Sequence, residues 1–222
     1  MKTKTVVMVL CIMAGCCLAA PANALLYSHD DGTGSSGIGL THDKNPNIIW
    51  ANHFTVVPGG ELITELQAAF GSGPSGSLNG DSVTASLWSD PNGDGKPLDA
   101  VLLTSVAGVV GNWGTDVFNS YDIPDTAVSG SFFVAMTLLD RSTNFPQSSN
   151  PARSSGGVSG HGWLGEGNNL QEADFNEFLA NMPAVFMVRA IGEPLTVPEP
   201  ATVLLISFGL LGLTVLRKKL RK

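Results

Sequence analysis

The stretch Ser82-Val-Thr-Ala-Ser-Leu-Trp88 alternates between two sets of side chains. In an extended strand one face would carry Val83, Ala85 and Leu87, and the other Thr84, Ser86 and Trp88. The residues that follow, Asp90-Pro-Asn-Gly-Asp-Gly95, are types that favour turns. An alternating segment that ends in a turn predicts a β-strand here.

The same pattern extends outward to six further apolar segments that turn residues separate. The additional predicted strands are Ile48–Val57, Leu62–Phe70, Ala100–Val110, Thr115–Ile123, Phe132–Leu139 and Phe186–Ile191. Phe132–Leu139 is apolar on both faces, which predicts a central and buried strand. Seven strands without helical crossovers predict an all-β fold built as a two-sheet sandwich.

One late segment has helical spacing instead. Four apolar residues recur there at positions i, i+3, i+4 and i+7: Phe175, Phe178, Leu179 and Met182. Asn169 and Glu172 are spaced as a helix cap. The glycine- and serine-rich stretch from 141 to 169 has little periodicity, and we expect a surface excursion or a functional loop there.

The first 24 residues have the pattern of a signal peptide. Lys2 and Lys4 precede an apolar run from Val6 to Ala20, and Ala22-Asn23-Ala24 is a small-x-small cleavage signal. The mature chain would begin at Leu25. The alternatives are a spanning helix, for which the run is too short, and a lipoprotein signal ending at Cys16.

All three cysteines, Cys11, Cys16 and Cys17, lie in this removable segment. The predicted mature domain, residues 25–196, therefore has no disulfide, no cysteine-ligated zinc and no cysteine nucleophile.

The C-terminal end has a three-part pattern. Val197-Pro198-Glu199-Pro200 forms a stiff joint, since two prolines continue neither a strand nor a helix. An apolar run, 201–216, follows and would reach about 24 Å as a helix, somewhat short of the roughly 30 Å hydrocarbon core. The basic end, 217–222, would stay cytoplasmic. We expect a transmembrane anchor.

The segment between the two ends is acidic. Residues 25–196 contain five Lys and Arg against eighteen Asp and Glu, which gives a net charge of −13, whereas the whole chain carries −7. This balance argues against nucleic acid as a partner and favours neutral sugars or divalent cations.

The tail resembles the PEP-CTERM sorting signal of Gram-negative bacteria through Val197-Pro198-Glu199-Pro200, the Leu/Gly-rich span with Gly209-Leu-Leu-Gly212, and the Arg/Lys end. The resemblance implies recognition by an exosortase, a transient anchor in the inner membrane, and removal of the tail. It also implies a place at the cell surface or in the extracellular matrix, where such proteins are linked to exopolysaccharide and biofilm.

The middle of the chain resembles jelly-roll-like sandwich domains of bacterial surface proteins. The matching stretches are Asn52–Val57, Ala85–Gly95, Ser131–Val134 and Phe186–Ala190. The resemblance implies a fold and no activity.

The turn after the alternating strand fits the first half of a calcium loop, D-x-N-x-D-G, with Asp90, Asn92 and Asp94 as oxygen ligands. The glutamate expected at the twelfth position is Val101, so Asp99 or a distant carboxylate would have to substitute for it. The alternative is an ordinary turn, which needs the same residue types. Calcium is the one cofactor that the sequence suggests.

Trp88 and Trp163 are the candidates for stacking on sugar rings, whereas we expect Trp50 in the core. His53 is predicted to be a half-buried, hydrogen-bonded side chain, and the histidine spacings do not favour zinc. Arg189, inside an apolar strand, is predicted to form an internal ion pair.

The sequence has no G-x-S-x-G motif, and we expect a non-catalytic module that is structural or binds glycans. Two alternatives stay open. One is a secreted glycan hydrolase with a carboxylate pair, for which Glu166 and Glu172 are candidates. The other is a calcium-stabilised structural module.

Overall fold

The computed structural model describes residues 24–37, 47–71, 77–138, 152–154, 161–175 and 185–195. The predicted signal peptide and the sorting tail, with its span at 201–216, lie outside these residues, as does most of the segment with helical spacing. No helix among the described residues is long and apolar enough to cross a membrane.

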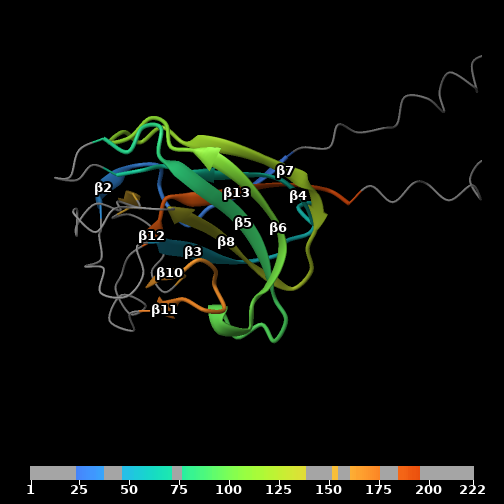
Figure 1. Cartoon of the computed structure of the whole chain (residues 1–222). Coiled ribbons are helices and arrows are strands. Elements are labelled where there is room, and N and C mark those ends of the chain that lie inside the picture. Colours follow the sequence, from blue (N-terminus) through green and yellow to red (C-terminus); the bar gives the residue numbers. More distant parts are fainter. Residues whose placement is uncertain are drawn as a thin grey trace, which may run out of the picture.

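The described chain is all-β, as predicted, with two main sheets that form separate layers (Figure 1). The four-stranded sheet has the order β1 (Leu25–Tyr27), β13 (Val188–Glu193), β4 (Leu62–Ala68) and β7 (Asn119–Ala127). The six-stranded sheet has the order β11 (Asp174–Phe175), β10 (Gly162–Glu166), β3 (Ile48–Thr55), β8 (Ser131–Leu138), β5 (Ser82–Asp90) and β6 (Val101–Val109).

A small third sheet consists of β12 (Val185–Phe186), β9 (Ala152–Ser154) and β2 (Gly34–Gly37). The 3-10 helix η1 (Pro97–Asp99) lies between β5 and β6. Each of the seven predicted strand segments overlaps a strand of the structure, although β7 begins and ends four residues later than predicted, and β8 is central, paired with both β3 and β5.

The main core lies between the two large sheets. Trp50 on β3 and Met136 on β8 face it from one sheet, and Leu66 on β4 and Val188 on β13 face it from the other. Trp50 is fully buried, which confirms its predicted place in the core. Hydrophobic burial between the layers therefore holds the sandwich together without disulfides.

Asn52 connects the two layers by hydrogen bonds. It lies on the core side of β3 and is fully buried. Its Nδ2 donates to the carbonyl oxygens of Phe186, at 2.7 Å, and Val188, at 3.0 Å, which belong to β12 and β13. Both N–H donors of this buried amide therefore have partners, whereas its Oδ1 has none among the described residues.

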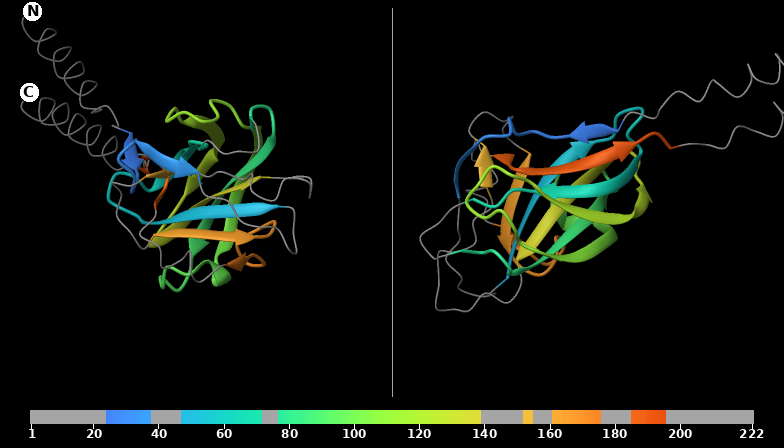
Figure 2. Two further views of the ribbon diagram at one scale, coloured as in Figure 1. Left: turned by 90° about the vertical axis from the view of Figure 1, so that its left-hand side faces the viewer. Right: turned by 90° about the horizontal axis from the view of Figure 1, so that it is seen from above.

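The first strand closes one edge of the four-stranded sheet beside the last strand. Leu25 pairs with Gly192 and Tyr27 with Ala190, so β1 and β13 lie side by side (Figure 2). Tyr27 donates its hydroxyl to the Gly60 carbonyl at 3.0 Å. A side chain at Gly60 would meet that hydroxyl at 2.5 Å, so the contact requires glycine. The two ends of the folded domain are therefore neighbours.

Candidate functional site

The acidic turn after β5 is organised by Asp90. Its carboxylate accepts hydrogen bonds from the backbone N–H groups of Gly93 and Gly95, each at 3.0 Å. Both glycines have left-handed backbone conformations, with φ of 70° and 73°, which glycine adopts without strain. Asn92 Oδ1 accepts from the Asp94 N–H at 2.8 Å, so this predicted ligand oxygen bonds to its own loop.

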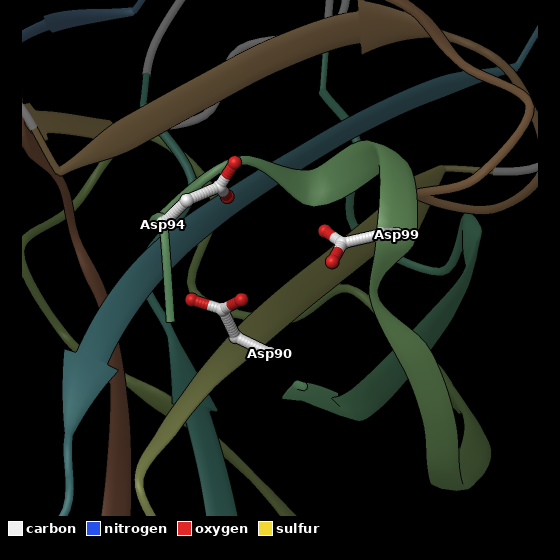
Figure 3. Close-up of side chains that lie close together, drawn as sticks. All are labelled: Asp90, Asp94 and Asp99. Carbon is white, nitrogen blue, oxygen red and sulfur yellow. The ribbon is translucent and has the colours of Figure 1, made fainter. Parts of the chain in front are cut away.

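Three carboxylates gather around this turn. Asp90, Asp94 and Asp99 each place an oxygen within 4.8 Å of the others, and Figure 3 shows the three groups facing a common space. Asp90 is buried and the other two are exposed. The helix η1 brings Asp99 to the turn, whereas Val101 at the twelfth loop position is 47% exposed. The residue named from the sequence as the substitute ligand therefore lies beside the two predicted aspartates.

This acidic cluster, defined as Asp90, Asp94 and Asp99, has the donor chemistry that calcium prefers. Within the described part of the chain, no other group of three His, Cys, Asp or Glu side chains lies as close. The cluster offers three of the six to eight oxygens that calcium takes, so water or backbone carbonyls would supply the rest.

His53 joins the acidic cluster to a second candidate site. Its Nε2 lies 2.9 Å from Asp90 Oδ2, and its side chain is 13% exposed. The predicted half-buried, hydrogen-bonded histidine is confirmed. The ring also packs on Phe133, with centroids 4.8 Å apart, and His53 is one of the residues that line a cavity.

That cavity, the histidine pocket, has a volume of about 420 Å³. Its lining combines three histidines, four further aromatic or hydroxyl-bearing residues and three aliphatic residues: Leu25, Leu26, Tyr27, Ser28, His29, His53, Phe54, Thr55, Val57 and His161. Since small-molecule sites are usually concave and mostly apolar with a few polar groups, this pocket has the composition of a binding site.

Ring stacking gives the pocket its shape. The His29 ring is stacked between Phe54, at a centroid distance of 4.6 Å, and His161, at 4.2 Å. His29 Nε2 lies 2.7 Å from the His53 carbonyl, and the His53 N–H donates to the His161 carbonyl at 2.9 Å. These bonds hold together three histidines that are far apart in the sequence.

Burial keeps His29 and His161 uncharged. It lowers the pKa of His29, and the neighbouring His161 lowers that pKa further, although the bond to the His53 carbonyl opposes the shift. Burial likewise lowers the pKa of His161. At neutral pH both rings are therefore neutral groups, which suits an uncharged ligand better than an anion.

The predicted stacking residues lie on the outer face of the six-stranded sheet. Trp88 is 5% exposed, and its indole N–H donates to Ser86 Oγ at 2.8 Å. Trp163 is partly buried and packs against the same apolar group as Trp88, which includes Ile49 and Phe133. This packing leaves Trp88 little ring face for a ligand, because a second apolar layer covers the sheet where the sequence suggested a surface.

The remaining candidates have structural partners. The Arg189 guanidinium forms an ion pair with the buried carboxylate of Asp30, which confirms the predicted internal pair. The Glu172 N–H donates to Asn169 Oδ1, as at a helix N-cap, and the Glu172 carboxylate accepts from Asn169 Nδ2. The chain then continues into strand β11 within the described residues, so the capping contacts form without the predicted helix there.

Comparison with known proteins identifies the tail. Residues 196–221 match the model of the PEP-CTERM protein-sorting motif. This chain carries a PEP-CTERM sorting signal. It is an exported protein whose membrane-anchored signal is processed by an exosortase. The strand β13 ends at Glu193, and the last described residue is Leu195. The motif begins at the next residue, 196.

One solved structure supports the fold, and the fold alone. The clostridial cysteine protease Cwp84 after propeptide cleavage matches 77% of this chain at 14% identity with a TM-score of 0.55. A structure of the cysteine protease and lectin-like domains of Cwp84, a surface layer associated protein of Clostridium difficile, matches 67% at 13% identity and a TM-score of 0.42. The chain spans 40% and 32% of these two chains. No curated protein matches.

Proposed function

We propose that this PEP-CTERM protein is a non-catalytic module of the cell surface or extracellular matrix that binds a neutral polysaccharide in the histidine pocket. The observation that supports it best is a concave aromatic site with uncharged hydrogen-bonding groups on a domain of net charge −13. Aromatic side chains and hydroxyl groups suit a sugar ring, and the acidic surface disfavours an acidic glycan.

The proposed location at the cell surface depends on where the signal peptide and the sorting signal join the domain. Leu25, the predicted first residue after signal cleavage, pairs with Gly192, four residues before the sorting motif begins. Removal of either signal therefore leaves the paired strands β1 and β13 intact. Deletion of residues 197–222 should change the location of the protein, measured by cell fractionation, and leave its melting temperature unchanged. The matched control is Glu193→Gln, outside the motif; normal sorting of the deletion variant would contradict the proposal.

The ligand part is tested with a glycan array on the processed protein. Leu26, which is 48% exposed and lines the pocket, is replaced by tryptophan to fill the cavity. Leu26→Trp should reduce binding of neutral glycans at least tenfold. Val117→Trp, at a position that is 56% exposed and away from the pocket, should not. Equal binding by both variants, or binding of acidic glycans alone, would contradict a neutral-sugar site in this pocket.

The acidic cluster supports a second role, in which calcium stabilises the module. Bound calcium would offset two of the three negative charges of the converging carboxylates and fix η1 against the turn. Because a ligand present at 100 times its Kd stabilises by about 2.7 kcal/mol, calcium should raise the melting temperature by several degrees relative to chelator. Asp99→Asn should remove that increase, and Asp125→Asn, on β7, should retain it. Identical melting temperatures with calcium and with chelator would exclude the role.

The hydrolase alternative has a direct test as well. A glycosidase needs two carboxylates about 5 to 9.5 Å apart across a bound sugar. Release of reducing ends from a glycan that the array identifies would replace the non-catalytic proposal, and the first candidates for substitution would be Glu166 and Glu172.

A further inference from the structure

The sequence contains two asparagine–glycine pairs, one on each side of β5. Asn79-Gly80 precedes the strand, and Asn92-Gly93 follows it in the acidic turn. All four residues are exposed, and both glycines have left-handed backbone conformations, with φ of 92° for Gly80 and 70° for Gly93. A glycine has no side chain to shield its backbone nitrogen, so this nitrogen can attack the side-chain amide of the asparagine before it. The two pairs share this chemistry and differ in their contacts.

The first difference is where the asparagine side chain is held. Asn92 Oδ1 accepts a hydrogen bond from the Asp94 N–H at 2.8 Å, which folds the side chain back along its own turn. This N–H is also placed to stabilise negative charge that develops on Oδ1 during an attack on the amide. Asn79 Oδ1 instead accepts from the Trp113 N–H at 2.9 Å, so its side chain is held by a segment 34 residues away.

The second difference is the group that accepts the glycine N–H. The Gly93 N–H donates to Asp90 Oδ1 at 3.0 Å, whereas the Gly80 N–H donates to the Val110 carbonyl at 2.8 Å. A carboxylate can take up a proton, whereas a peptide carbonyl is too weak a base to do so. Asp90 is buried, and its Oδ2 lies 2.9 Å from His53 Nε2. Only the Asn92 pair therefore has a fixed base on the attacking nitrogen.

We propose that Asn92-Gly93 is a self-modification site at which Asn92 loses its amide group, with Asp90 as the base. The Gly93 nitrogen gives up its proton and forms a bond to Asn92 Cγ. The bond from Cγ to Nδ2 breaks, and the Nδ2 group leaves with a proton as ammonia. Water then opens the cyclic imide at either of its carbonyls, which produces aspartate or isoaspartate at position 92 without any change in oxidation state.

The modification changes the acidic cluster. Aspartate at position 92 adds one carboxylate to the three of Asp90, Asp94 and Asp99, at a position that the sequence predicts to be an oxygen ligand. Isoaspartate instead lengthens the backbone by one methylene and disturbs the turn. Because the released ammonia diffuses away, the charge of this turn records how long each molecule has existed.

Peptide mapping by mass spectrometry tests the proposal on the full-length chain, purified as the cell processes it and incubated at neutral pH with a chelator. Replacement of an amide by a carboxylate changes the peptide mass, so Asn79 and Asn92 are followed separately in the same molecules. In the folded chain we expect Asn92 to convert about tenfold faster than Asn79. In denaturant the two rates should become similar, because both turns lose their contacts. Equal rates in the folded chain, or the same ratio with and without denaturant, would overturn the proposal.

The variant Asp90→Asn tests the base. It keeps an oxygen that can accept the Gly93 N–H but removes the proton acceptor, so conversion of Asn92 should slow about tenfold while Asn79 keeps its rate. The matched control is Asp125→Asn on β7, which should alter neither rate. Unchanged conversion of Asn92 in folded Asp90→Asn would overturn the proposal. If this variant does not fold, the comparison of the two asparagines in the unaltered chain decides.

Discussion

The two main sheets differ in whether other residues cover their outer faces. In the four-stranded sheet, β13 alternates between buried and partly exposed residues, the pattern of a sheet with one covered face. In the six-stranded sheet, β8 is buried from Phe132 to Leu138 without interruption, and β3 is buried from Ile48 to Asn52. A second apolar layer, with Leu170 and Ala173 from the segment after β10, covers that outer face.

This difference locates the candidate site. Asp90, His53 and Phe133 all lie on the outer side of the six-stranded sheet, where the ring of His53 packs on Phe133 and its Nε2 bonds to Asp90. The acidic cluster is therefore attached to a rigid, doubly covered sheet. The four-stranded sheet supplies the neighbouring ends of the domain. One layer thus carries the site residues of the acidic cluster, and the other carries the connections to the two signals.

The largest expected effect tests whether the second apolar layer is a true core. Phe133→Ala removes a fully buried ring from the outer face of β8 and should lower the free energy of unfolding by about 3 to 5 kcal/mol. The matched large-to-small change in the four-stranded sheet, Leu26→Ala at a 48% exposed position, should cost about 1 kcal/mol or less. Chemical denaturation measures both, and equal costs would contradict the contrast between the sheets.

A smaller effect tests the hydrogen bonds that join the layers. Asn52→Leu keeps the branched shape of the side chain but leaves the carbonyls of Phe186 on β12 and Val188 on β13 without their buried donor, and it should cost about 2 to 3 kcal/mol. Gln67→Leu makes the same change on the partly exposed outer side of β4 and should cost about 0.5 kcal/mol. A neutral Asn52→Leu would mean that burial alone joins the sheets.

The ion pair on β13 is the exception to the simple outer face of the four-stranded sheet. Arg189 bonds to the buried Asp30 carboxylate and lies over the Phe118 ring, with Cζ 3.8 Å from its centre. Arg189→Ala should lower the free energy of unfolding by about 2 kcal/mol, because it leaves the buried Asp30 carboxylate without its partner. The loss is moderate because the Arg189 side chain is itself 16% exposed. Adding Asp30→Asn should recover part of the loss. An unaltered melting temperature for Arg189→Ala would refute the pair's structural role.

The smallest effect concerns pH and the histidine pocket, which lies where β1 meets β3. The pKa values of His29 and His161 are lower in the folded chain than the usual 6.5, so near pH 6 the unfolded chain binds more protons. Stability should therefore be complete above about pH 6.5 and fall as the pH drops below it. The groups that face His29 are Asp30, His53 and His161.

Melting temperatures between pH 7.5 and 5.5 measure this slope, and His161→Gln should flatten it. Asp125→Asn, an exposed change on β7, should leave the slope as it is. A slope that His161→Gln does not alter would assign the pH dependence to other groups.

The sequence predicted the parts of the fold that rest on local pattern. The alternation at 82–88 correctly placed Val83, Ala85 and Leu87 on one face, which the structure shows to be the core face, and the apolar run at Phe132 correctly predicted the central strand. Short strands such as β1 and β11 have too few residues to show a period. The burial of Trp88 was missed because the layer that covers it comes from residues about 80 positions later in the chain, such as Leu170.

The candidate sites were likewise predictable only where their residues are close together in the sequence. The turn at Asp90–Gly95 and the substitute Asp99 lie within ten residues, and their proximity in the structure follows from that spacing. The histidine pocket had no sequence signal, because His29, His53 and His161 come from three separate segments and meet through backbone hydrogen bonds and ring stacking. Such a site depends on the topology of the sheets.

The pairing of Leu25 with Gly192 has a further consequence for the design of variants. Because the first and last strands are neighbours, a short linker from Glu193 back to Leu25 would close the domain into a ring. New ends could then open at an exposed loop such as the one around Thr115, away from the acidic cluster and the pocket. Such a circular permutant would keep the sandwich, but its two ends would lie in the loop around Thr115 instead of beside β1 and β13. The position at which the domain is attached could then be changed without changing its fold.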